Sequence, residues 1–179
     1  MPAERQALSH GFGPFHTPES RVLILGSFPS VKSREQSFFY GHPRNRFWPV
    51  LAAICREETP DTLEEKKAFL ERHHIALYDV IESCSIVGSS DSSIRDVVPA
   101  DLRPILSGTS VENRIYTNGR TAAALYERYL FPLLGIPAVP LPSTSPANAA
   151  CSLPKLTERW AAALLPALSD CVQNPSENA

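Results

Sequence analysis

An unbroken apolar run, Val-Leu-Ile-Leu at positions 22–25, lies between Arg21 and Gly26. Such a run, ended by a glycine, is typical of a parallel strand that is buried on both faces of a sheet. Further apolar stretches predict strands at 75–81, 114–117 and 135–141, and periodic segments predict helices at 45–54, 61–74, 121–130 and 153–171. Because strands alternate with helices, we expect an α/β fold, a three-layer α/β/α sandwich around a mostly parallel four-stranded sheet.

The length of 179 residues fits a single domain spanning 1–179. We expect residues 1–19, which have little periodicity, to be a lead-in segment, and residues 172–179 to be a flexible tail. The loops at 27–44, 82–98 and 142–149 each follow a predicted strand. Ligands bind beyond the carboxyl ends of parallel strands, so the sequence predicts a site where these loops converge.

The first of these loops begins with Gly26-Ser-Phe-Pro-Ser30. A tight turn here would expose backbone N–H groups, and we expect Ser27, Phe28 and Pro29 to contact a base edge or a phosphate. Phe38, Phe39 and Tyr40 are a candidate stacking surface for a planar ligand. We expect Tyr40 to stack on the ligand, although all three rings could instead belong to the core.

The same loop ends in Gly-His-Pro-Arg-Asn-Arg-Phe-Trp at 41–48. Arg44 and Arg46 are candidates for phosphate contacts, and Asn45 between them can both donate and accept hydrogen bonds. Asn45 also lies where it could cap the predicted helix. Phe47 and Trp48 are expected in the core.

A second constellation, Leu-Pro-Ser-Thr-Ser-Pro-Ala-Asn at 141–148, places three hydroxyls and an amide on a proline-containing loop. These groups could bind a backbone phosphate. The alternative, equally open from the sequence, is a turn that caps the C-terminal helix.

Charge is unevenly distributed along a chain whose formal net charge is −2. Residues 21–46 carry five Lys or Arg and one acid, whereas residues 57–101 carry eleven acids and four bases. Such a chain could present a basic face to phosphates, although ordinary solvated surfaces would have the same distribution of charge along the sequence.

The four cysteines form no CxxC pair, so we expect reduced thiols, no metal site and no cofactor. Without a signal pattern or membrane span, we expect a cytoplasmic monomer that binds no membrane.

Together these motifs resemble the uracil-DNA glycosylase superfamily, over roughly residues 20–160. The string at 41–48 is similar to one in the mismatch-specific uracil glycosylases. Its combination with 26–30, with 143–148, and with Asp-Val-Ile-Glu-Ser-Cys at 79–84 followed by Gly-Ser-Ser-Asp-Ser-Ser-Ile at 88–94 resembles the hypoxanthine-DNA glycosylase branch. The resemblance implies an enzyme of base-excision repair that acts on double-stranded DNA containing a deaminated base.

The resemblance also implies roles for individual residues. Phe28 stands where the mismatch-specific enzymes carry a catalytic asparagine, and Ser143 stands where the usual second motif begins with histidine. Efficient uracil removal is therefore not expected. In the hypoxanthine branch the catalytic role falls to the asparagine at the position of Asn45; if that assignment fails, Ser27 or Asp79 is next. The residues expected to hold DNA are Arg44, Arg46, Ser143, Thr144, Ser145, Pro146, Ala147 and Asn148.

The implied reaction is hydrolysis of an N-glycosidic bond after the base leaves the stack. No lysine lies in the 26–30, 41–48 or 143–148 motifs, so a monofunctional enzyme without a Schiff base is expected. Two alternatives remain open: a uracil or broad-range glycosylase on the same fold, and a non-catalytic nucleic-acid-binding α/β domain.

Overall fold

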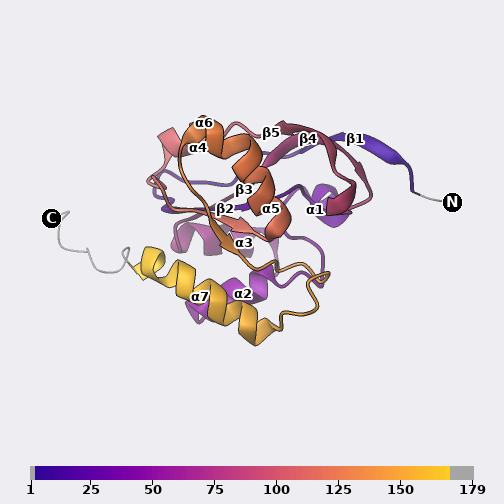
Figure 1. Cartoon of the computed structure of the whole chain (residues 1–179). Coiled ribbons are helices and arrows are strands. Elements are labelled where there is room, and N and C mark those ends of the chain that lie inside the picture. Colours follow the sequence, from indigo (N-terminus) through magenta and orange to yellow (C-terminus); the bar gives the residue numbers. More distant parts are fainter. Residues whose placement is uncertain (1–2, 170–179) are drawn as a thin grey trace.

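A four-stranded parallel sheet forms the centre of the computed structural model, which describes residues 3–169 (Figure 1). The strand order is β3-β2-β6-β7, with every neighbouring pair parallel. The strands are β2 (Val22–Gly26), β3 (Ile75–Asp79), β6 (Ile115–Asn118) and β7 (Val139–Leu141). All five residues of β2 and of β3 are buried, as continuous apolar runs require.

Helices cover both faces of this sheet (Figure 1). On one side α2 and α7 pack against each other, and on the other side α5 contacts β6 and β7. The helices are α1 (Val31–Gln36), α2 (Phe47–Cys55), α3 (Leu63–Arg72), α4 (Arg103–Gly108), α5 (Arg120–Leu125), α6 (Phe131–Leu134) and α7 (Leu153–Ser169). The predicted α/β/α sandwich around a four-stranded parallel sheet is therefore confirmed.

A second sheet, which the sequence did not predict, packs beside the first. It is antiparallel, with the order β1-β4-β5, and consists of β1 (Arg5–Ser9), β4 (Ile81–Val87) and β5 (Arg95–Pro99). The expectation of a loop at 82–98 was wrong apart from a short 3-10 turn, Asp91–Ser93, and its flanking residues. Register shifts within the β4–β5 pair break the two-residue alternation that would have identified β4.

The lead-in segment 1–19 also has more structure than its sequence indicated. Strand β1 is almost entirely exposed, so it carried no hydrophobic signal. Beyond it, the His10 N–H donates to the Glu82 carbonyl at 2.8 Å, and Phe15 and Leu77 exchange two backbone hydrogen bonds. The segment therefore runs from the antiparallel sheet to the outer side of β3.

Cys55, Cys84 and Cys151 form no disulfide with one another. Cys171, which was expected to end the last helix, and the expected tail at 172–179 lie outside the described residues. Within residues 3–169, no helix is both long enough and apolar enough to cross a membrane.

Candidate functional site

A pocket of about 350 Å³ opens at the carboxyl ends of the parallel strands. Gly26, Asp79 and Asn118, which end β2, β3 and β6, lie on its wall. Both sequence motifs reach it, through the predicted site residues Ser27, Phe28, Pro29, Tyr40, Asn45, Ser143, Thr144, Ser145, Pro146 and Ala147. Arg44, Arg46 and Asn148 are not part of its lining.

The Asn45 side chain is held in one orientation by two hydrogen bonds. Its Oδ1 accepts from the Phe47 backbone N–H at 3.0 Å and from the Thr144 hydroxyl at 2.8 Å. Since a backbone N–H can only donate, the carbonyl oxygen must face it and the amide nitrogen must point away. That nitrogen has no acceptor among residues 3–169, so Asn45 offers the pocket a donor.

Thr144 and Asn118 extend this contact into a network that joins the two motifs. The fully buried Thr144 accepts from the Asn118 amide at 2.9 Å, and its backbone N–H donates to the Asn118 carbonyl oxygen at 3.1 Å. The contact between Asn45 and Thr144 spans 99 positions of sequence. Asn118, the last residue of β6, was not predicted as a site residue, although a polar residue directly after an apolar strand was a signal for it.

Tyr40 is half-buried and lies flat against Phe47, with ring centroids 3.9 Å apart and an interplanar angle of 18°. Its hydroxyl is buried and has no hydrogen-bond partner with normal geometry among residues 3–169. Burial, and secondarily the nearby charge of Asp79, raises the pKa of this phenol above its ordinary value, while Asn118 opposes the shift. Tyr40 is therefore a neutral ring with one face already covered.

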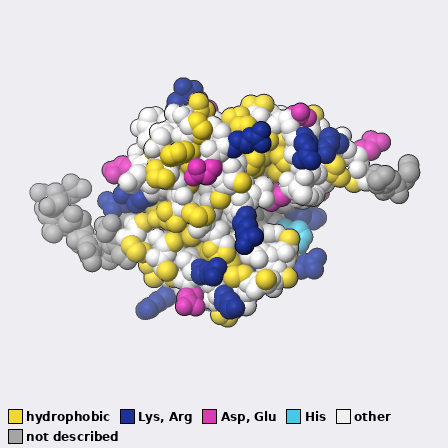
Figure 2. Space-filling model, in the orientation of Figure 1, with side chains coloured by type: hydrophobic (Ala, Val, Ile, Leu, Met, Phe, Trp, Pro, Cys, Tyr) yellow, Lys and Arg dark blue, Asp and Glu magenta, His cyan; other side chains and the backbone are white. Residues whose placement is uncertain are grey.

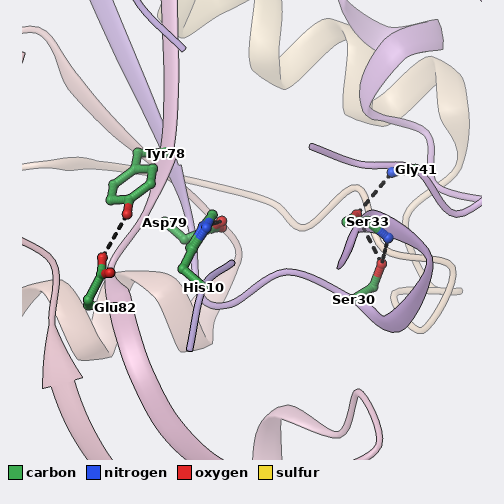
Figure 3. A network of polar contacts seen from close by, with 7 residues as sticks. All are labelled: His10, Ser30, Ser33, Gly41, Tyr78, Asp79 and Glu82. Carbon is green, nitrogen blue, oxygen red and sulfur yellow. Dashed lines mark hydrogen bonds and ion pairs between the residues drawn. The ribbon is translucent and has the colours of Figure 1, made fainter. Parts of the chain in front are cut away.

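Gly41, which directly follows Tyr40, is held to α1 by hydroxyl groups, as Figure 3 shows. Ser33 accepts from the Gly41 backbone N–H at 3.0 Å and from the Ser30 hydroxyl at 3.0 Å. Phe38 and Phe39 are buried, so these two aromatics belong to the core. Phe47 and Trp48 are also core residues, as expected.

Phe28 occupies the wall between the pocket and a small apolar cluster under the second sheet. It is buried there with Ile81, Cys84, Ile86 and Ile94. The phenyl ring can form a wall of the pocket, but it cannot position water.

Two carboxylates reach the pocket at different depths. Asp79 is buried, and its Oδ2 lies 2.6 Å from the Nε2 of buried His10, which comes from the N-terminal segment (Figure 3). Asp91 is exposed at the mouth, where the Ser27 hydroxyl donates to its Oδ1 at 3.0 Å. Although Asp91 is exposed, the protein packed around its carboxyl group raises the pKa of Asp91, and the charge of Asp79 raises it further. Hydrogen bonds from Ser27 and Thr121 oppose this shift. Neither His10 nor Asp91 was predicted as a site residue, although Asp91 lies in the string at 88–94 that resembles the hypoxanthine-DNA glycosylase branch.

The second motif is shaped by its own polar groups. The Ser143 and Ser145 hydroxyls accept from the backbone N–H groups two residues later, at 3.1 and 3.2 Å, and the Asn148 amide donates to the Ser143 carbonyl at 2.9 Å. Pro146 and Ala147 are exposed at its tip. The cap of α7 is formed by Ser152, so residues 143–148 are not the helix cap that the sequence left open.

The two arginines of the first motif lie in different environments. The Arg46 guanidinium donates to the carbonyls of Ser145 and Asn148, both at 2.9 Å, and to the carbonyl of Cys151. These contacts hold the second motif, and the predicted contact of Arg46 with DNA stays a prediction. Arg44 is exposed, and its side chain makes no hydrogen bond or ion pair with residues 3–169.

The distribution of basic side chains on the surface and the grouping of possible metal ligands bear on DNA and metal binding. On the face in Figure 2, Lys and Arg side chains are spread among apolar and polar surface and form no single continuous patch. Among the described residues, no three His, Cys, Asp or Glu side chains come together in a way that could hold a metal ion.

The chain is similar in sequence to a protein family and to two proteins of known name. Residues 13–167 match the family model of the uracil DNA glycosylase superfamily. The chain is 34% identical over 142 residues to a hypoxanthine DNA glycosylase of Methanosarcina acetivorans, covering 79% of this chain and 89% of that protein. A hypoxanthine DNA glycosylase of Methanosarcina barkeri is 34% identical over 87 residues, which is 48% of this chain and 55% of the relative.

A solved structure agrees with these sequence relatives. The solution NMR structure of a candidate uracil DNA glycosylase from Methanosarcina acetivorans superposes with a TM-score of 0.73 at 32% identity, over 88% of this chain and 96% of that one. The family match covers most of the chain, and both matched motifs line one pocket. The chain therefore belongs to the uracil DNA glycosylase superfamily.

Proposed function

We propose that this protein is a monofunctional DNA glycosylase of base-excision repair that hydrolyses the N-glycosidic bond of a deaminated base, foremost hypoxanthine, flipped from double-stranded DNA. The observation that carries the proposal is the Asn45 amide, which is fixed as a donor into a pocket of about 350 Å³. A pocket of this size suits a single planar ligand. The names of the Methanosarcina relatives support hypoxanthine as that ligand.

In this mechanism the base enters the pocket and stacks on the face of Tyr40 that Phe47 leaves free. The Asn45 amide nitrogen then donates to a carbonyl oxygen of the base. As the bond breaks, negative charge develops on the base, and a donor fixed in advance lowers the energy of that state. Asn45 is accordingly the catalytic side chain, acting through its donor.

Asp91 is suited to act on the water. A base that fills the interior places its sugar near the mouth, where this carboxylate lies. The water oxygen bonds to C1′ while the bond from C1′ to the base nitrogen breaks, and that electron pair leaves with the base. Asp91 takes a proton from the water and returns it to solvent, and the departing base takes a proton from solvent, so the hydrolysis balances.

The DNA backbone would lie against the second motif. Its exposed tip, Pro146 and Ala147, together with Asn148, would enter the space left by the base. The backbone and hydroxyl groups of 143–145 and the free Arg44 would meet phosphates. Arg46 contributes by holding this motif in place. We also expect the protein to act as a monomer in the cytoplasm.

Base release tests the proposal directly. Duplexes containing inosine, xanthine or uracil are incubated with the protein in EDTA, and the free bases are quantified. We expect hypoxanthine to be released without added metal and uracil poorly. Release of uracil but never hypoxanthine would indicate the alternative glycosylase, and binding without release of any base would indicate the non-catalytic domain.

A further inference from the structure

We infer that His10 is a positioning residue for Asp79, and that the carboxylate it orients reads the ring N–H of the flipped base. The inference rests on the proposed function and adds the group that distinguishes a deaminated base from its parent. His10 lies outside residues 13–167, the part of the chain that matches the superfamily model. The pair joins positions 69 residues apart, from the end of the β1 segment to the end of β3.

The hydrogen bond between the two side chains has a defined direction. An ionised carboxylate only accepts, so the Nε2 of His10 donates to Oδ2 of Asp79 over 2.6 Å. The imidazole is 1% exposed and is held between the rings of Phe12 and Tyr78, with centroids 4.5 and 4.6 Å away. The rigidly packed ring of His10 can hold the Asp79 carboxylate in one rotamer. The hydrogen bond occupies only Oδ2, one of the two carboxylate oxygens.

The other oxygen of Asp79 is available to the pocket. Oδ1 accepts no hydrogen bond within residues 3–169, and it is not among the sealed polar atoms that lack a partner. It lies so close to Gly26 that a Cβ atom at that position would collide with it. Both residues line the pocket, so Gly26 leaves the space that lets Oδ1 lie at the wall.

A fixed carboxylate oxygen selects bases by the hydrogen on the ring nitrogen. Hypoxanthine carries a hydrogen on N1 beside its carbonyl, whereas adenine presents a lone pair on N1. Oδ1 would accept from the first and repel the second. Xanthine and uracil also carry a ring N–H beside a carbonyl, so the same oxygen suits deaminated bases as a class. A site built around such a hydrogen bond rejects a mismatched ligand strongly, because its own polar group is left unpaired.

His10 variants can separate positioning from simple support of the fold. His10→Phe keeps an aromatic ring and removes the donor, while His10→Gln returns an amide N–H close to the place of Nε2. His73→Phe is the matched control, because His73 pairs with Glu57 at 2.9 Å at the end of α3, outside the pocket. Asp79→Asn keeps the shape of the side chain but places an amide where the carboxylate was.

The readout is binding as well as activity. Dissociation constants are measured for two duplexes that differ in one nucleotide, a hydrolysis-resistant 2′-fluoro deoxyinosine or a 2′-fluoro deoxyadenosine, together with single-turnover release of hypoxanthine and thermal unfolding. We expect His10→Phe to lower the preference for inosine about tenfold or more, equivalent to about 1.4 kcal/mol. His10→Gln should recover part of that preference, His73→Phe should match the wild type, and Asp79→Asn should lose most of it.

Unchanged preference in folded His10→Phe would overturn the inference, even with full activity in the wild type. If His10→Phe does not fold, unchanged preference in His10→Gln and Asp79→Asn would overturn it equally. A wild-type protein that releases no deaminated base would instead count against the proposed function, whereas the ratio of the two dissociation constants still reports on His10.

Discussion

The two loops that form the pocket are held in place by different forces. The first loop, residues 27–46, is anchored by buried aromatics, with Phe38 and Phe39 in the core and Tyr40 stacked on Phe47. The second loop, residues 142–152, buries few large side chains and is held by hydrogen bonds, above all from Arg46 and Asn118.

The two kinds of anchor indicate which substitutions should lower activity while the fold stays intact. An apolar anchor fails when its volume changes, whereas a hydrogen-bonded loop fails when one donor or acceptor is lost. Asn45 belongs to both systems, because it lies in the first loop and accepts a hydrogen bond from Thr144 of the second. Substitutions at this junction and on either side of it can therefore test the comparison.

We expect the largest effect from Asn45→Asp. Aspartate can still accept from the Phe47 N–H and the Thr144 hydroxyl, so the junction should persist. It cannot donate when ionised and would repel the leaving base, and losing one such donor costs about 10²–10³ in rate. Single-turnover excision and thermal unfolding measured together would check this. Near wild-type excision by both Asn45→Asp and Asn45→Ala would show that the residue serves only the junction.

Asp91→Asn should have the next largest effect, on the order of 10²-fold, typical of a lost general base. Ser27 connects the first loop to this carboxylate by one hydrogen bond. Because the folded-state pKa of Asp91 is raised, ionisation costs stability above that pKa, and none of this cost remains below the unfolded pKa. The variant avoids this cost, so we expect it to be at least as stable as the wild type at neutral pH. Because only an ionised Asp91 can take a proton, we expect excision by the wild type to slow as the pH falls through the pKa of Asp91. A pH–rate profile of the variant that keeps the wild-type acidic limb would exclude this role.

Tyr40→Ala should slow excision by roughly one to two orders of magnitude, since stacking on a base is worth about 1–3 kcal/mol. Tyr40→Phe should be mild, because within the described part of the chain the hydroxyl has no hydrogen-bond partner of normal geometry, and the stack on Phe47 remains. Excision rates for the two variants, each with a measured melting temperature, provide the check. A folded Tyr40→Ala protein with normal rates would return this ring to the core of the first loop.

Arg46→Met should loosen the second loop and destabilise the fold by on the order of 2–3 kcal/mol, because carbonyl acceptors lose a charged donor. We expect about tenfold weaker substrate binding with little change in the chemical step. Arg44→Met is the matched control and should leave stability unchanged while lowering the salt slope of DNA binding by about 1. If Arg46→Met were equally stable and changed only the salt slope, direct DNA contact, as the sequence predicted, would be restored.

The smallest effects are expected at the tip of the second loop. Ser145→Ala removes the acceptor for the Ala147 N–H, and Asn148→Gly removes the donor to Ser143. Each loses one ordinary hydrogen bond, so DNA affinity or excision should fall about two- to tenfold with the fold intact. Titration of a fluorescent duplex resolves changes of this size, and wild-type affinity and rate in both variants would mean that the tip does not enter the DNA.

Local signals in the sequence were enough for the parallel sheet and for the position of the pocket. A strand buried on both faces must be continuously apolar, and 22–25 and most of 75–79 satisfy that requirement. Since parallel strands end at one edge, the loops that follow them had to meet there, which brought Tyr40, Asn45 and Ser143 to one pocket. The superfamily itself was also readable from the motifs.

Only the tertiary structure decided the second sheet, the partner of Arg46, the side of Asn45 that faces the pocket, and the contact of His10 with Asp79. Strand β4 is bulged and β1 is exposed, so neither follows a simple period. These polar contacts join positions 69 to 105 residues apart. The identity of a polar side chain does not indicate which distant atom will form a hydrogen bond with it. Hydrophobic burial acts on whole segments and leaves a repeating pattern, whereas a hydrogen bond depends on two atoms that meet only when the chain has folded.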